Sequence, residues 1–166
     1  RSLRLTSRVL VDLYEVDAAQ PRQIDWFAHA NCASVDTVDD DTTSPAASLG
    51  RGVGYEHLTF GQSRPSRAAS RWDFQVEGAK LRMWCTGDSE EATFTAVGIG
   101  YSIAQKTPTV VRRRRDAKQA RFVTVYDLTG RGDYGTGIDP IDPANPNTIV
   151  VRTTGGPQRT TFEKPR

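Results

Sequence analysis

Two histidines are the side chains of this sequence best suited to acid–base chemistry or ligand binding. His29 lies in QIDWFAHANC, residues 23–32, and His57 lies in YEHLTF, residues 55–60. An imidazole can act as a general base, neutralise a negative charge or coordinate a metal. Both histidines neighbour aromatic residues, which suits a sugar-binding surface and equally suits ordinary packing in a sheet. Both interpretations stay open for His29, Tyr55 and His57.

Two of the three tryptophans differ in the face of the strand on which they are expected. In RWDFQVEG, residues 71–78, Trp72 alternates with Phe74 on the apolar side, which predicts a core residue. Trp84 alternates with Arg82, opposite the apolar side of its strand. We therefore expect Trp84 either to be exposed, where its ring could stack on a sugar, or to lie between two layers.

Four consecutive arginines, residues 112–115, could bind sulfate, carboxylate or nucleic acid. Successive side chains of a strand alternate between its faces, so only two of the four can share one surface. No zinc finger, helix-turn-helix or RNA-binding aromatic motif accompanies them, and we expect no nucleic-acid partner. The alternative is a solvated edge strand protected by charge. The RGD at residues 131–133 is a short chance match and carries no weight.

The sequence contains no recognisable assembly of nucleophile, base and oxyanion donors. Gly-x-Ser-x-Gly and His-Glu-x-x-His are absent, and the glycine-rich stretches lack the strand–turn–helix context of a phosphate-binding loop. Cys32 and Cys85 permit one disulfide without requiring it, and no CxxC spacing is present. We predict neither a metal site nor a cofactor.

Composition predicts one globular domain, residues 1–166. Hydrophobic residues make up 37% and charged residues 25%, which excludes a disordered chain. No run approaches the roughly 18 apolar residues of a membrane span. The net charge of +2, from 22 basic and 20 acidic residues, is too balanced for a polyanion partner across the whole surface. No signal-peptide pattern opens the sequence, whose first residues already alternate like a strand, so we expect a fragment or processed chain.

Alternation of apolar and polar residues predicts about ten strands and almost no helix. The clearest segments are residues 8–16, 24–32, 55–60, 71–78, 79–87, 92–98, 108–115, 120–128 and 147–153. Short polar connections predict hairpins at 77–80 and 116–119. Long loops are expected at 39–54, and at 130–147, where glycines and prolines argue against regular structure. Turn signals every 8–12 residues favour an all-β fold, an antiparallel β-sandwich.

Four stretches follow one another in a distinctive order: LRLTSRVLVDLYEV, IDWFAHA, GYEHLTFGQSRPSRAASRWDFQVEGAKLRMWCTG and PTVVRRRRDAKQARFVTVYDL. Their succession resembles the later part of the β-sandwich region of heparinase II/III-like polysaccharide lyases, a group that includes alginate and oligoalginate lyases. The resemblance covers roughly residues 3–128 and rests on the order of the strands and the types of residue in them. Residues from 129 onward match no part of it.

The resemblance implies an α-helical toroid followed by antiparallel β-sheets, with the active site in the cleft between them. Such lyases cleave uronic-acid polysaccharides by β-elimination. The uronic carboxylate is neutralised, a Tyr or His removes the C5 proton, and a Tyr or His protonates the leaving oxygen. The chief Asn, His and Tyr lie on the toroid, while a further His and a structural zinc site lie in the first part of the sandwich. None matches a position here, so we assign no catalytic residue and no metal ligand.

We therefore expect the C-terminal β-sandwich portion of such a lyase, which supports the substrate cleft and is inactive alone. The expected partners are a uronic-acid polysaccharide or oligosaccharide and the missing N-terminal helical and upstream β parts of the enzyme, without a membrane. The expected location is the periplasm or the extracellular medium. The candidate substrate-binding residues are His29, Tyr55, His57 and Trp84. The alternatives are a freestanding carbohydrate-binding or structural sandwich, with Trp84 and Tyr55 stacking on sugars, and a polyanion binder acting through residues 112–115.

Overall fold

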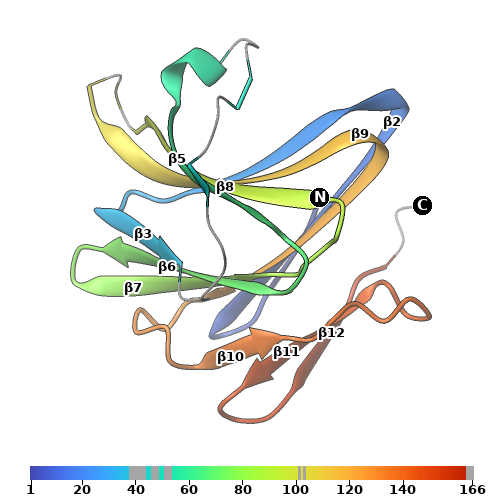
Figure 1. Ribbon diagram of the computed structural model, residues 1–166. Helices are drawn as coiled ribbons and strands as arrows, with labels where there is room; N and C mark the ends of the chain where they lie inside the picture. The colour runs from blue at the N-terminus through green and yellow to red at the C-terminus, as the bar shows by residue number, and fades with distance from the viewer. Residues whose placement is uncertain (38–43, 46–48, 51–53, 101, 103, 164–166) are drawn as a thin grey trace.

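Antiparallel β-structure dominates the computed structural model, which describes residues 1–37, 44–45, 49–50, 54–100, 102 and 104–163 (Figure 1). All pairings between these residues are antiparallel, so the all-β prediction is confirmed. Within the described ranges, no helix has the length and apolar character needed to cross a membrane. Most of the loop predicted at 39–54 lies outside the described residues.

The strands form a nine-stranded sheet and a separate three-stranded sheet, the latter in the order β10-β11-β12. One short 3-10 helix, η1 (Tyr55–His57), precedes β5. The strands are β1 (Ser2–Leu5), β2 (Val9–His29), β3 (Ser34–Thr37), β4 (Ser44–Pro45), β5 (Thr59–Pro65), β6 (Ser70–Val76), β7 (Ala79–Cys85), β8 (Glu91–Ile99), β9 (Lys106–Asp127), β10 (Gly135–Ile138), β11 (Thr148–Thr153) and β12 (Gln158–Thr161).

Two long strands, β2 and β9, organise the large sheet. They pair from Val9↔Asp127 to His29↔Thr109, with register shifts near the middle of both strands. The other edge of β9 carries β8, β5 and β4 along its first half, and β7, β6 and β3 along its second half. We call these two parts of the sheet the β8 half and the β7 half. Because the β2–β9 ribbon bends between them, the two halves face each other, as Figure 1 shows.

Three apolar clusters define the order of the layers. The first fills the space between the β8 half and the β7 half, and includes Trp26, Trp72 and Phe122. The second joins the opposite face of the β7 half to the small sheet through Trp84 and its neighbours. The third lies on the outer face of the β8 half, where Leu49 is buried. Both facing layers belong to one continuous sheet, so this arrangement does not by itself establish the predicted two-sheet sandwich.

Local patterns predicted several of these elements. Trp72 is 2% exposed in the core between the two halves, as its alternation indicated. The hairpin predicted at 77–80 is confirmed, because Val76 pairs with Ala79 and Gly78 takes a φ of 69° in the turn. Glycine adopts this left-handed conformation without the steric cost of a Cβ.

Three predicted elements were wrong. Residues 116–119 do not form a hairpin, because β9 runs through them and stays paired with β2. Their polarity instead reflects exposure at the bend of the ribbon. Tyr55–His57 form η1 rather than a strand, after Gly54 with a φ of 98°. The region 130–147 does contain regular structure, since β10 pairs with β11 there.

The four arginines of residues 112–115 do not lie on an edge strand. They belong to β9, which has a strand on both sides. Arg112 and Arg113 are each 1% exposed and pair with Glu91 and Asp25 respectively. Arg114 also has acidic partners, Asp88 and Glu90. The edge-strand interpretation was wrong, and the buried ion pairs remove two arginines from any polyanion-binding patch.

The contact between Gly135 and Trp84 gives a direct test of the packing between the β7 half and the small sheet. A Cβ on Gly135 would lie 2.7 Å from two ring carbons of Trp84. We expect Gly135→Ala to lower the free energy of unfolding by about 1–3 kcal/mol, measured by urea denaturation. Gly155→Ala is the matched control, because its Cβ would have no neighbour closer than 3.8 Å. Equal losses in the two variants would contradict this packing.

Candidate functional site

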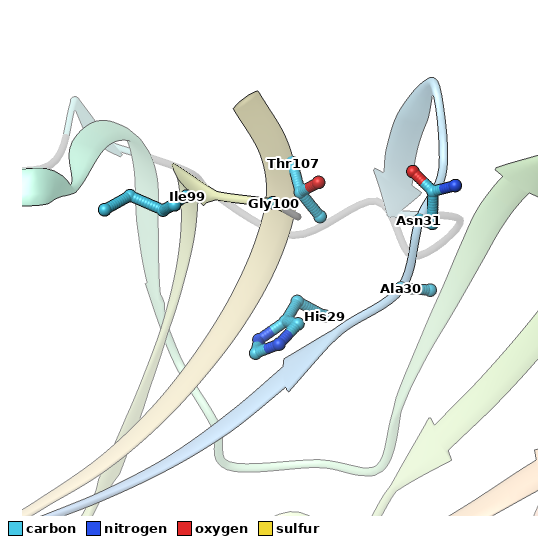
Figure 2. Close-up of a pocket in the computed structure, with 6 residues that line it drawn as sticks. All are labelled: His29, Ala30, Asn31, Ile99, Gly100 and Thr107. Carbon is cyan, nitrogen blue, oxygen red and sulfur yellow. The ribbon is translucent and has the colours of Figure 1, made fainter. Parts of the chain in front are cut away.

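A shallow, open pocket of about 290 Å³ lies at the end of β2, beside the connection between β8 and β9. Figure 2 shows the imidazole of His29 extending from β2 toward the strand that carries Ile99. The pocket is lined by His29, Ala30, Asn31, Ile99, Gly100 and Thr107.

Strand register brings the residues that line this pocket together. His29 pairs with Thr109 on β9, and Thr107 of the same strand pairs with Gly98 on β8. A Cβ on Gly100 would lie only 2.7 Å from the hydroxyl oxygen of Thr107. Glycine at this position therefore lets the backbone after β8 approach Thr107 closely, and the side chain of His29 borders the pocket beside it.

Two polar side chains give the pocket its hydrogen-bonding capacity. Gln105 Nε2 donates to Asn31 Oδ1 over 3.0 Å, which orients the carboxamide and leaves Asn31 Nδ2 as a donor. The exposed imidazole of His29 adds a further group, whereas Thr107, which is only 3% exposed, forms part of the pocket wall. Such a set can bind the hydroxyl or carboxylate oxygens of a small polar ligand.

An aromatic pair, exposed Phe27 and half-buried Tyr55, lies next to these polar groups. Phe27 is two residues from His29 on the same face of β2, and it is 40% exposed. The centroid of its ring lies 6.5 Å from that of Tyr55, with a tilt of 36°. Exposed rings can pack on the apolar faces of sugars. We call His29, Asn31, Thr107, Phe27 and Tyr55 the His29 surface.

Tyr55 is held in place by a buried ion pair. Its hydroxyl donates to Asp25, which also accepts two hydrogen bonds from Arg113, at 2.8 and 2.6 Å. Gln23 Nε2 donates to the same tyrosine oxygen over 3.3 Å. Burial, followed by the hydrogen bond to Asp25, raises the pKa of Tyr55. The phenol therefore stays protonated at neutral pH and serves as a fixed ring rather than as a base.

The structure brings together only part of the predicted set. Phe27 neighbours both His29, on the same face of β2, and the ring of Tyr55, so these predicted residues share one surface. His57 lies on η1 with an exposed side chain, its Nε2 3.7 Å from Glu56, and it does not line the pocket.

Trp84 is buried and does not lie on a surface where it could stack on a sugar. It is 4% exposed between the β7 half and the small sheet, with Gly135 against its ring. The guanidinium carbon of Arg82 lies 5.9 Å from the centre of the same ring. Trp84 therefore takes the second of its two expected positions, between two layers, and the prediction that it binds a sugar was wrong, because the protein itself covers the ring.

The site residues predicted from the sequence did not include Phe27, Asn31 or Thr107. Phe27 and Asn31 alternate with His29 on one face, so the pattern of β2 alone could have included them. Thr107 is distant in the sequence and joins the site only through the register between β2, β9 and β8.

The two cysteines give no nucleophile and no crosslink. Cys32 and Cys85 are both free thiols. Burial raises the pKa of both thiols, which keeps them protonated and poorly reactive. Among the residues that the structure describes, no group of three or more His, Cys, Asp or Glu could hold a metal ion.

No protein-family model matches the chain, and no curated protein matches it. The resemblance to the lyases therefore rests on the four stretches of sequence. Any activity, substrate or partner inferred from it is a proposal.

Proposed function

We propose that the chain is a sugar-binding β-sheet module of a lyase that cleaves uronic-acid polysaccharides. Its two facing halves would form the sandwich that follows a helical toroid in such enzymes. The observation that best supports this proposal is the juxtaposition of the exposed donors on His29 and Asn31 with the exposed ring of Phe27. The module would hold an acidic sugar, with bond cleavage done by another part of the enzyme.

The His29 surface matches the two kinds of group on a uronic acid. Imidazole and carboxamide N–H groups can donate to a carboxylate or to the oxygen of a ring hydroxyl. Phe27 supplies an apolar face for the C–H side of the ring. Because the pocket is open and shallow, binding of a single sugar would be weak, and affinity would grow with oligosaccharide length.

Two further observations support a module that assists the chemistry without performing it. The buried carboxylates of Asp25 and Glu91 are each bound by an arginine, so neither is free to move a proton.

Within the described residues, β1 pairs only with β2, and its Leu3 and Leu5 are 58% and 67% exposed. Exposed apolar residues on a sheet edge favour a neighbour there, here the proposed remainder of the enzyme. Its location would then be periplasmic or secreted.

Sugar binding by the chain tests this proposal. We expect His29→Ala and Asn31→Ala each to weaken binding of an unsulfated uronate oligosaccharide about fivefold, because each removes one polar contact of roughly 1 kcal/mol. Isothermal titration calorimetry measures the affinity, and circular dichroism checks the fold. His57→Ala is the matched control, since that imidazole is exposed but lies outside the pocket. Wild-type affinity in both pocket variants would contradict the proposal.

An activity assay separates support from catalysis. The chain alone should give no rise in ultraviolet absorbance from unsaturated product with alginate or heparan sulfate. Turnover by the chain would show that it carries its own catalytic groups. Sugar binding in a protein shown to lack any larger enzyme would favour the freestanding carbohydrate-binding module instead.

A further inference from the structure

We propose that a second pocket of this chain binds a single carboxylate or sulfate group through Arg8. The pocket has a volume of about 510 Å³ and lies where the β1–β2 turn meets the connection between β9 and β10. It shares no residue with the His29 surface, so it goes beyond the function proposed above. Its lining residues are Arg8, Thr129, Arg131, Asp133, Tyr134 and Thr154.

The aromatic wall of this pocket is rigid. The backbone N–H of Tyr134 donates to the buried carboxylate of Asp127 over 2.8 Å. At the other end of the residue, Gln158 Nε2 donates to the Tyr134 hydroxyl over 2.7 Å. These two anchors fix the ring, and the guanidinium carbon of Arg8 lies 4.8 Å from its centre. This cation–π contact holds the Arg8 side chain in place before any ligand arrives.

The charges around this pocket leave Arg8 available for an anion. Among the described residues, the guanidinium of Arg8 has no carboxylate partner, unlike Arg82, Arg112 and Arg113 of the large sheet. The pocket contains a second arginine, Arg131, whose Nε lies 3.4 Å from Asp133 in an exposed ion pair. The lining side chains carry two guanidinium groups and one carboxylate, while the buried carboxylate of Asp127, behind Tyr134 and Thr129, is already bound by four hydrogen bonds.

Carboxylate and sulfate groups fit this arrangement through the same chemistry. Each presents two oxygens to the planar fork of a guanidinium, which donates two parallel hydrogen bonds. The hydroxyl of Thr154 lines the same space and adds a further donor. A uronic acid supplies the carboxylate and a sulfated sugar supplies the sulfate, so titrations with the two simple anions distinguish the sources.

The test is a titration of the wild-type chain with sodium sulfate and, separately, with sodium glucuronate, followed by the amide NMR signals. At constant ionic strength set with sodium chloride, we expect saturable shifts at Arg8, Tyr134 and Thr154. Arg8→Ala should weaken binding at least about tenfold, since it removes a charge-assisted bidentate contact. Arg8→Lys should recover only part of the loss, because lysine keeps the charge without the fork. Arg115→Ala, which removes an exposed arginine elsewhere, should bind like the wild type.

Two variants of Tyr134 test whether its ring positions Arg8 for binding. Tyr134→Phe loses the hydrogen bond from Gln158 but keeps a ring beneath Arg8, so it should retain most of the binding, whereas Tyr134→Leu should weaken it more. Unchanged affinity for both anions in Arg8→Ala, or no saturable shift at these amides with either anion, would overturn the proposal. His29→Ala should leave this binding intact, so failure of the His29 surface and failure of the Arg8 pocket can be told apart.

Discussion

Replacing Glu91 by Gln is expected to lower the free energy of unfolding by about 3–5 kcal/mol, since breaking a buried ion pair leaves one charge uncompensated. The side chains of Glu91 and Arg112 are 0% and 1% exposed, and two hydrogen bonds of 2.5 and 3.0 Å join them. The neutral amide would keep the shape but leave the guanidinium buried without a counter-charge. Chemical denaturation followed by tryptophan fluorescence measures the loss.

Arg112 makes this pair a link between the two halves of the large sheet. Its Nη2 donates to the carbonyl of Thr86 over 2.7 Å and its Nη1 to that of Val123 over 3.1 Å. The guanidinium carbon also lies 5.8 and 5.3 Å from the ring centres of Trp26 and Phe122. Losing the counter-charge therefore perturbs the central core and not only one contact.

The double variant Glu91→Leu with Arg112→Met is the control for this prediction. It removes both charges, so we expect it to be more stable than Glu91→Gln, at a cost near 1–2 kcal/mol relative to the wild type. The carbonyl of Val123 keeps a donor, because the backbone N–H of Thr86 also reaches it. A Glu91→Gln variant within about 1 kcal/mol of the wild type would show that the buried charge is tolerated without its partner.

Asp127→Ala is expected to destabilise the chain by about 3 kcal/mol, because it leaves several donors unsatisfied at once. The carboxylate is fully buried and accepts four hydrogen bonds at the start of the β9–β10 connection. Two come from Thr129, at 2.9 and 2.6 Å, and two from the backbone N–H groups of Tyr134 and Gly135, at 2.8 and 2.9 Å. The change would release the connection that brings β10 to Trp84. Urea denaturation at neutral pH gives the loss.

The same carboxylate predicts a loss of stability in acid. Burial alone would raise the pKa of Asp127, but the hydrogen bonds from Thr129, Gly135 and Tyr134 outweigh burial and lower it from the ordinary 3.8. A lowered pKa in the folded state contributes stability above the ordinary value, and that contribution disappears as the pH falls through the folded value. The expected loss therefore begins near pH 4 and deepens below it.

Asp127→Asn isolates this effect. The amide keeps one acceptor oxygen and does not titrate, so its stability deficit should be smaller than that of Asp127→Ala. The difference between wild type and Asp127→Asn should shrink as the pH falls from 5 to 3. A difference that is constant over this range would contradict the role given to the carboxylate.

Alternation along β2 and β6 shows how much of the fold can be predicted from short patterns. Ile24, Trp26 and Ala28 are each at most 6% exposed. Phe27 and His29, on the other face of the strand, are exposed. A strand with one buried face must place its apolar residues with period two, so the pattern fixes which face is inside. The same reasoning identified the core position of Trp72 and the turn after β6.

Long-range packing decided what these patterns could not predict. The polar residues 116–119 look like a turn, yet β2 pairs alongside them, so β9 continues. Trp84 lies opposite the core face of its strand, and only the presence of the small sheet makes that second face buried. The His29 surface likewise needs Thr107 and Gly100, whose position beside β2 depends on the register of three strands. Local sequence carries no signal for such a register.

Sugar binding at the end of β2 is the proposal on which the function depends. An amide NMR titration of the chain with an unsulfated uronate tetrasaccharide tests it. We expect saturable shifts in three segments, residues 27–31, 98–100 and 105–107. Saturation that leaves all three segments unchanged, or no binding at all, would contradict it.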